Sequence, residues 1–293
     1  MISPFFAEAH ELRTEFERRV GPSRSLDPTR FVWDYWHVPG QYSYLRTPAH
    51  RFFPTPLYGR LLATIRAWGT ATLGCAAVSD PWLSYYLDGG GQELHADVPQ
   101  GPWSYVYSLT RDPGFTGGET VLLRDEILDY WAGFDADRPL ERDDLLHRIS
   151  SEFDQLVVFD SRVPHGVSTV RGTTDPLRSR VVLHGWFRPP TLTVRGGLRP
   201  DQIAEPAAAL NEHWAQASRA CGPLSGIAVW EVAIDPDGSA HPRPLTGTLV
   251  ATAHSATGPA AAIQRMTDAL ASTRFPPAAQ ASTVLFPVSA GFR

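Results

Sequence analysis

Residues 92–98 read QELHADV, and within this stretch His95 and Asp97 stand two positions apart. Alternate residues of an extended strand point to the same face, at a separation of roughly 6.5 Å along the strand. An imidazole and a carboxylate placed in this way can bind one metal ion together. The stretch follows the turn-forming run Asp88-Gly89-Gly90-Gly91, so we expect it to be a strand of a β-rich fold.

A second histidine, His165, is the residue that we expect to complete this site. It follows Pro164 and a predicted buried strand at 155–160 (QLVVFD). Two imidazoles and one carboxylate cover one face of an octahedral ion and leave the opposite face open, as in non-haem Fe(II) oxygenases. A His-x-Asp pair alone is a weak signal, so the prediction depends on the motifs that surround it.

Short predicted strands separated by turn signals dominate the middle of the chain, interrupted by an acidic segment of helical character at 124–152. The strands are expected at 82–88, 92–98, 103–110, 119–123, 155–160, 165–170 and 178–187. Strands of this length and spacing predict a jelly-roll barrel of cupin-like architecture. Helices at 5–20 and 56–73 are expected to support it, and an aromatic-rich arm at 26–55 would pack in its core or line a substrate groove.

A second, smaller domain is expected after the Pro/Gly-rich linker at 188–200. Its predicted helices and strands lie at 201–221, 227–234, 247–251, 259–273 and 283–288. We therefore predict an α+β protein with two domains: a jelly-roll domain over 1–190, whose core is 80–187, and a small α+β domain over 201–293.

Composition narrows the classes of function. The 293 residues are 43% hydrophobic, and the net charge of −5 does not favour nucleic acid or an anionic membrane as a partner. All 26 basic residues are arginine, which excludes mechanisms that use a lysine. Cys75 and Cys221 match no disulfide or zinc framework. No run is typical of a signal peptide or a membrane span, so we expect a cytoplasmic protein.

From Leu83 to Phe187 the chain resembles the prolyl-hydroxylase-type branch of the 2-oxoglutarate/Fe(II)-dependent dioxygenases. The matching pieces, in chain order, are Tyr86, His95-x-Asp97, Gly117-Gly118-Glu119, Phe159-Asp160-Ser161, His165-x-Val167, and Arg180 six residues before Trp186-Phe187. The resemblance implies a double-stranded β-helix in which His95, Asp97 and His165 bind Fe(II). It also implies that Arg180 pairs with the distal carboxylate of 2-oxoglutarate, since a guanidinium matches a carboxylate bidentately.

The anchor of the co-substrate has an alternative. His165 and Arg180 are further apart in the sequence than is usual in the family, so Arg178 could take the role, although the spacing to Trp186 favours Arg180. His184 shares a strand face with Arg180 and Trp186. It would support the metal ligands, face the substrate, or simply pack with a hydrogen bond.

Further contacts to the co-substrate are expected from Tyr86, Tyr107, Ser108 and Trp186. Tyr86 competes with Tyr85 for one tyrosine role, and we favour Tyr86. Ser108 stands where the family often has a second tyrosine, with Tyr107 beside it.

The implied activity is hydroxylation of a C–H bond in an amino acid, free or within a peptide or protein, with release of succinate and CO2. Fe(II), 2-oxoglutarate and O2 are the expected cofactor and co-substrates, with ascorbate as a further candidate. Asp97 argues against the related halogenases, which lack this carboxylate. Two alternatives are a non-catalytic metal-binding sensor or interaction protein on the same barrel, and a metal hydrolase or isomerase, which would not need Arg180. The oligomeric state stays open.

Residues 201–293 resemble, at the level of the fold, the AgmX/PglI and TonB carboxy-terminal families. The match consists of His213-Trp214 to Cys221-Gly222, Val229-Trp230-Glu231-Val232, Asp235-Pro236-Asp237-Gly238, Arg274-Phe275-Pro276 and Leu285-Phe286-Pro287-Val288. Such domains bind peptides or partners, often through sheet edges. The resemblance implies recognition of a substrate or a partner, or stabilisation of the barrel.

Overall fold

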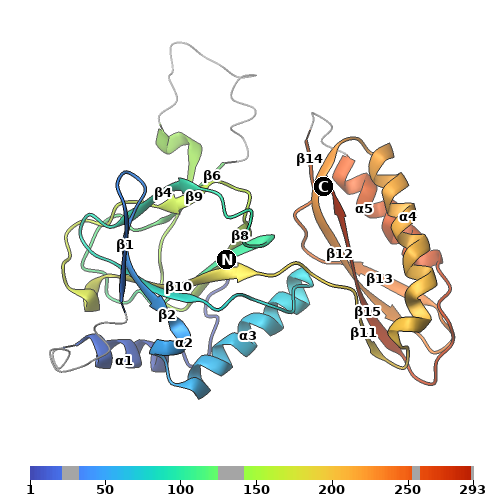
Figure 1. The fold of residues 1–293 in the computed structure, drawn as a ribbon, viewed down its shortest axis with the longest axis horizontal. Helices are drawn as coiled ribbons and strands as arrows, with labels where there is room; N and C mark the ends of the chain where they lie inside the picture. Colours follow the sequence, from blue (N-terminus) through green and yellow to red (C-terminus); the bar gives the residue numbers. More distant parts are fainter. Residues whose placement is uncertain (22–32, 125–141, 253–257, 292–293) are drawn as a thin grey trace, which may run out of the picture. The chain divides into compact units, whose positions relative to one another are not determined.

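The computed structural model describes residues 1–21, 33–124, 142–252 and 258–291 and divides the chain into two compact units. The first unit comprises Met1–Thr64 and Val78–Phe187, and the second comprises Ile65–Ala77 and Arg188–Arg293. The long helix α3 (Thr55–Leu73) begins in the first unit and ends in the second. Figure 1 shows a curled sheet in the first unit and a sheet with two helices in the second.

A curled antiparallel sheet forms the first unit, and its strands are β1 (Asp34–Val38), β2 (Tyr42–Pro48), β3 (Trp82–Tyr86), β4 (Gly91–His95), β5 (Trp103–Ser108), β6 (Thr120–Leu123), β7 (Leu146–Ile149), β8 (Gln155–Asp160), β9 (His165–Val167) and β10 (Arg180–Phe187). The strand order is β7-β6-β9-β4-β2-β3-β10-β5-β8. From β3 to β6, and again from β7 to β10, successive strands alternate between a β3-β10-β5-β8 half and a β7-β6-β9-β4 half, while β6 and β7 pair with each other within the second half. This is the jelly-roll arrangement, so the predicted fold class is confirmed.

Several predicted strands are shorter in the structure than in the sequence-based prediction. The strand predicted at 92–98 ends at His95, and the one predicted at 165–170 ends at Val167. The strand predicted at 178–187 begins at Arg180. There the Asp175 side chain accepts a hydrogen bond from the Leu177 backbone (2.9 Å) and stabilises a short 3-10 turn at Pro176–Arg178.

The helical interpretation of the acidic segment 124–152 is wrong over its last residues. Leu146–Ile149 form β7, which pairs antiparallel with β6 from Thr120↔Ile149 to Leu123↔Leu146. Local composition favoured a helix, but the open edge of β6 supplies backbone hydrogen bonds that only the tertiary structure provides. Residues 125–141 lie outside the described part of the chain, as does most of the acidic run 135–144.

The arm contains a hairpin of β1 (Asp34–Val38) and β2 (Tyr42–Pro48). Gly40 takes a positive φ of 72° in the turn between them. β2 also pairs with β3 and β4, so the arm is part of the barrel wall. Residues 22–32, at the start of the arm, lie outside the described part of the chain.

Gly117 and Gly118 allow the chain to pass close to the segment after β9. Both take a positive φ, 73° and 74°, which glycine adopts without steric cost. A Cβ on Gly117 would lie only 2.1 Å from the carbonyl oxygen of Thr169. A Cβ on Gly118 would press on the Arg180 side chain at 3.3 Å. The glycine pair therefore makes room for a residue of the expected site.

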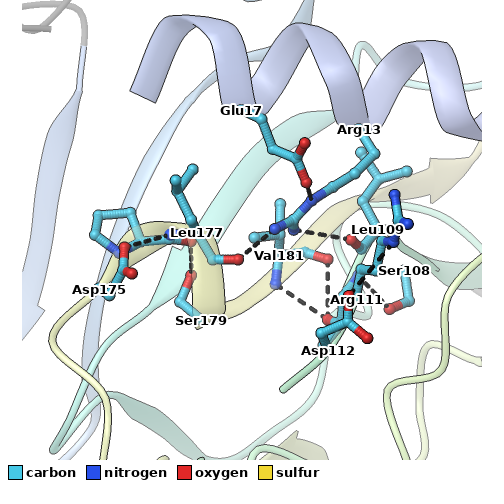
Figure 2. A network of polar contacts seen from close by, with 12 residues as sticks. Arg13, Glu17, Ser108, Leu109, Arg111, Asp112, Asp175, Leu177, Ser179 and Val181 are labelled. Atoms are coloured by element: carbon cyan, nitrogen blue, oxygen red, sulfur yellow. Dashed lines mark hydrogen bonds and ion pairs between the residues drawn. The ribbon is translucent and has the colours of Figure 1, made fainter. Parts of the chain in front are cut away.

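Helix α1 (Ala9–Val20) buries Leu12 and Phe16 at helical spacing. The short helix α2 (Ala49–Phe52) packs against it, with the ring centres of Phe16 and Phe52 6.0 Å apart. α1 also carries a buried arginine, Arg13. Figure 2 shows its guanidinium between Glu17 (2.8 Å), the Leu109 carbonyl (3.1 Å) and the Leu177 carbonyl. The two carbonyls belong to the segments that follow β5 and precede β10, so Arg13 connects the helix to both strands.

The variant Arg13→Met is expected to lower the free energy of unfolding by about 2–4 kcal/mol, because two buried carbonyls lose their donor. Urea unfolding followed by tryptophan emission would measure the change. Arg18→Met is the control, since Arg18 is 65% exposed and pairs with Glu15 on the surface. Its effect should stay within about 0.5 kcal/mol. Equal unfolding midpoints for the two variants would contradict the role of Arg13.

The second unit contains a sheet of order β11-β15-β12-β13, with β14 paired to β12. Its elements are β11 (Thr193–Gly196), a 3-10 turn (Pro200–Ile203), α4 (Ala204–Ala220), β12 (Leu224–Ile234), β13 (Ala240–Pro244), β14 (Val250–Ala251), α5 (Gly258–Ser272) and β15 (Ser282–Ala290). Trp230, Val232, Met266 and Leu270 form the centre of its core.

Two predictions for the second unit are corrected. The linker 188–200 contains β11, which pairs with β15, and β13 was not expected from the sequence. The division into domains at 190 and 201 stays a prediction. No helix among the described residues is long and apolar enough to cross a bilayer.

Candidate metal centre and co-substrate cavity

The two histidines of the expected site face each other across an antiparallel strand pair. His95 at the end of β4 is the direct partner of His165 at the start of β9. Asp97 follows β4, and its backbone N–H donates to the Ser161 carbonyl (2.8 Å), which fixes it beside the two imidazoles. One ligand atom from each of the three side chains lies within 4.8 Å of the others, a grouping that can hold a metal ion.

Backbone hydrogen bonds set the tautomers of both histidines. Nδ1 of His95 lies 2.9 Å from the Glu93 carbonyl, and Nδ1 of His165 lies 2.9 Å from the Val163 carbonyl. A carbonyl only accepts, so each Nδ1 carries the proton and each Nε2 offers a lone pair. Such bonds orient metal-binding histidines and increase their basicity.

The Nε2 atoms point at the Asp97 carboxylate. Nε2 of His165 lies 3.1 Å from Oδ2, and Nε2 of His95 lies 3.8 Å from Oδ1. Three acceptors repel one another at such distances unless a proton or a cation lies among them. The chemistry of this set therefore fits a divalent metal ion that accepts nitrogen and oxygen ligands, as Fe(II) does.

Asp97 stays ionised in this site. Burial by itself raises the pKa of its carboxyl, but the contact with the His165 imidazole, the hydrogen bond from Trp186 and the electrostatic influence of the two histidines outweigh burial and lower the pKa to about 2. Burial lowers the pKa of His95, which favours its neutral, metal-binding form. Both shifts keep the ligands in the protonation states that a metal ion requires.

Oδ2 of Asp97 is held by two further donors. Nε1 of Trp186 donates to it at 2.7 Å and Oγ of Ser104 at 3.1 Å. These bonds occupy one carboxylate oxygen and leave Oδ1 as the oxygen for a metal ion. Trp186 was expected from the sequence as a co-substrate contact, whereas Ser104 was not singled out.

The variant Trp186→Phe is expected to weaken Fe(II) binding roughly 10- to 100-fold, because it keeps the ring but removes the donor to Asp97. Anaerobic titration against a colorimetric Fe(II) chelator would measure the affinity. Trp214→Phe is the matched control, since Nε1 of Trp214 donates to the Ser289 carbonyl (2.8 Å) in the second unit. Equal Fe(II) affinities for the two variants would exclude this role for Trp186.

Arg180 is the second component of the cavity, and it is only 1% exposed. Its Nη2 donates to Oγ1 of Thr120 (3.1 Å), while Nε and Nη1 have no hydrogen-bond partner among the described residues. The guanidinium lies 4.8 Å from the ring centre of Tyr86, its cross-strand partner on β3. Burial lowers the pKa of Arg180, yet an arginine stays charged in proteins.

A buried cation with unpaired N–H groups is costly, at about 1–3 kcal/mol for each unsatisfied group. A bound carboxylate would remove that cost, since it matches the guanidinium fork and neutralises its charge. The residues thus fit the distal carboxylate of a 2-oxo diacid such as 2-oxoglutarate.

One cavity of about 280 Å³ contains both components. Of the residues expected from the sequence, it is lined by His95, Asp97, His165, Arg180, Tyr86, His184 and Trp186. The Tyr86 hydroxyl donates to Oε1 of Gln92 (3.0 Å). Nε2 of His184 lies 2.9 Å from Oγ of Ser84, and burial lowers the pKa of His184 to about 3, so it is neutral.

Three expected residues lie away from the cavity lining. The Tyr107 hydroxyl donates to Oδ1 of Asp154 (2.8 Å), because Tyr107 points to the opposite face of β5 from the lining residue Val106. Oγ of Ser108 bonds to Oγ of Ser151 (2.8 Å). Arg178 lies in the turn before β10 and packs against Gly114. The cavity therefore holds Arg180 and not its alternative.

The arm was expected either to pack in the core or to line a substrate groove, and four of its residues line the cavity. Tyr42, Tyr44 and Arg46 of β2 and Trp36 of β1 line the cavity. The alternation in YSYLR (residues 42–46) was a usable signal, because residues 42, 44 and 46 of one strand share a face.

No known family model and no curated protein sequence matches the chain. Solved structures are similar, among them the following two. A prolyl-4-hydroxylase from Pseudomonas putida is 18% identical with a TM-score of 0.43, over 64% of this chain and 90% of that one. An oxidoreductase of the 2OG-Fe(II) oxygenase family from Burkholderia pseudomallei is 16% identical with a TM-score of 0.37, over 60% of this chain and 89% of that one.

Proposed function

We propose that this chain is an Fe(II)- and 2-oxoglutarate-dependent oxygenase that hydroxylates a C–H bond of an amino acid, free or within a peptide. The observation that carries the proposal is the combination in one cavity of three convergent metal ligands and a buried arginine with unpaired donors. A metal site alone would suit many reactions. A dedicated carboxylate anchor beside it is specific to a metal reaction with an acidic co-substrate.

His95, Asp97 and His165 would hold the iron, and Arg180 with Thr120 would hold the distal carboxylate of the co-substrate. Bound Fe(II) with 2-oxoglutarate and O2 would supply the oxidant, so that the substrate C–H becomes C–OH while succinate and CO2 are released. Trp186 and Ser104 orient the Asp97 carboxylate, and Tyr86 covers one face of the Arg180 guanidinium. The buried position of Arg180 excludes water from its ion pair, which strengthens that pair.

The alternative functions explain less of the site. A metal hydrolase or isomerase on the same barrel has no use for the unpaired donors of Arg180. A non-catalytic sensor would use both components but would not consume O2. Succinate production therefore separates the sensor from the oxygenase.

Anaerobic addition of Fe(II) and then 2-oxoglutarate is expected to produce the weak visible charge-transfer band of a chelated 2-oxo acid. Admission of O2 should then release succinate. Glutarate, which lacks the 2-oxo group, is the control ligand and should give no band. Iron-loaded protein without a band would contradict the proposal. A band that appears while O2 releases no succinate with any amino acid or peptide substrate would favour the sensor.

For residues 201–293 we propose recognition of a substrate or a partner. Support comes from β13, which stands at one end of the described sheet, since sheet edges bind extended peptides. The resemblance to AgmX/PglI and TonB domains, the cytoplasmic location and the use of ascorbate stay predictions.

A further inference from the structure

A second guanidinium enters the same cavity, at a place that the proposed chemistry does not use. Arg46 lies near the end of β2, two and four residues after Tyr44 and Tyr42, and all three line the cavity. Its side chain is 17% exposed, whereas Arg180 is 1% exposed. Arg46 is thus accessible from solvent in a way that the co-substrate anchor is not.

Two indole rings fix the Arg46 guanidinium. Its central carbon lies 3.6 Å from the ring centre of Trp36 and 4.3 Å from that of Trp82. Trp36 is on β1 and Trp82 is on β3, the strands that pair with β2 on either side. Stacked rings cover guanidinium faces and leave the N–H edge for planar ligands, so Arg46 is preorganised to bind a carboxylate.

The neighbours of Arg46 leave donors for such a ligand. Nε donates to Oδ2 of Asp34 (3.2 Å), a residue whose side chain is 53% exposed. The Tyr44 hydroxyl is a further polar neighbour. A guanidinium has five N–H donors, and an exposed ion pair is weak because water and salt screen it. The pair with Asp34 therefore orients Arg46 without saturating it.

The charge of the cavity favours an anion in addition to the co-substrate. Among its described lining residues Asp97 is the one carboxylate, against the two cations Arg46 and Arg180. His184 lies close to both arginines. Burial is the main cause of its lowered pKa and the charge of Asp97 opposes it, but the charges of Arg180 and Arg46 lower the pKa further. With the iron present the cavity would be more positive still. One diacid bound at Arg180 would leave the exposed Asp34 as the carboxylate that pairs with Arg46 among the described residues.

We propose that Arg46 binds a carboxylate of the molecule that is hydroxylated. The substrate is then a small acid, presented as a free amino acid or as the carboxylate end of a peptide, and not an internal residue of an uncharged segment. The inference rests on the proposed function. The cavity volume of about 280 Å³ agrees with a small substrate, because it lies just below the usual range of ligand pockets, about 300–1,000 Å³.

The experiment uses the full chain with Fe(II) and 2-oxoglutarate and a panel of the common amino acids. Each is offered as the free acid, as its carboxamide, as the C-terminal residue of a dipeptide, and inside a peptide capped at both ends. Mass gain of one oxygen measures turnover. Anaerobic titration of tryptophan emission measures binding, since Trp36 and Trp82 contact Arg46.

The expected result is turnover of a probe with a free carboxylate and loss of turnover in its carboxamide. In Arg46→Met the KM for that acid should rise about 10- to 100-fold, because a hydrogen-bonded charge is lost. The KM for 2-oxoglutarate and the iron content should not change. If Arg46 had only a structural role, the variant would instead change these two quantities together with the KM for the acid. Free acids and dipeptides separate the two sources of the carboxylate. Arg60→Met is the control, since Arg60 pairs with Glu8 on the surface and does not line the cavity.

Three results would overturn the inference: equal use of acids and carboxamides, turnover of the doubly capped peptides alone, or a panel in which no carboxylate binds. Failure of the proposed function has a different signature, the absence of the charge-transfer band with 2-oxoglutarate. Binding of acids that depends on Arg46 would then still be visible in the emission titration, so the two failures are distinguishable.

Discussion

Replacement of His165 by alanine is expected to abolish stable Fe(II) binding and to reduce turnover by on the order of 10³-fold or more, since the metal supplies several kcal/mol of the rate enhancement. His165 is 7% exposed and provides one of the three convergent ligands. Without its Nε2, two ligands on one short segment would remain. Iron content after anaerobic loading and desalting is the direct measurement, and succinate release is the second.

His147→Ala is the matched control for this prediction. His147 lies on β7 with an exposed side chain and does not line the cavity. It should retain the iron content and the activity of the unaltered chain. A His165→Ala protein that is folded by circular dichroism and still retains a full equivalent of iron would exclude the triad as the metal site.

Arg180→Met is expected to weaken 2-oxoglutarate binding by about 2–5 kcal/mol, roughly 30- to 4,000-fold, because one partner of a buried charge pair is lost. The iron content should stay unchanged. The charge-transfer titration measures the affinity. Arg178→Met is the control that separates the two candidate anchors, and it should leave the affinity within about twofold, as expected for a residue that does not contact the ligand.

Arg180→Met is expected to weaken ligand binding but to increase the thermal stability of the ligand-free protein. The ligand-free protein should melt at a higher temperature as Arg180→Met, because a buried cation with unpaired N–H groups is replaced by an apolar side chain of similar length. Added 2-oxoglutarate should raise the melting temperature of the unaltered chain and not that of the variant. A variant that is destabilised without ligand and still stabilised by 2-oxoglutarate would show that Arg180 is a structural residue.

The arm illustrates what the sequence could predict and what it could not. The alternation of Tyr42, Tyr44 and Arg46 was visible, and a substrate groove was one of two interpretations. However, the position of Arg46 between two indoles depends on β1 and β3 pairing with β2, and Trp82 is 36 positions away in the sequence. Local patterns carry no information about which strands become neighbours.

Tyr107 and β7 illustrate the same limit. Tyr107 and Ser108 were expected beside the co-substrate, but side-chain alternation along β5 turns Tyr107 to Asp154, and Ser108 bonds to Ser151 beyond the cavity lining. A helical pattern at 146–149 gave way to a strand because β6 offered hydrogen bonds there. In both cases a contact from a distant segment decided the outcome.

The sequence by itself therefore determined the types of the ligands, their order, and the fold class. His-x-Asp, the later histidine and the arginine six residues before Trp186 are short-range features, and turn signals between short strands are local as well. The tertiary structure decided which lone pairs converge, which oxygen of Asp97 stays available, and which second cation enters the cavity. The reason is physical: these properties depend on hydrogen bonds and packing between strands that are far apart in the chain and become neighbours only when the sheet closes.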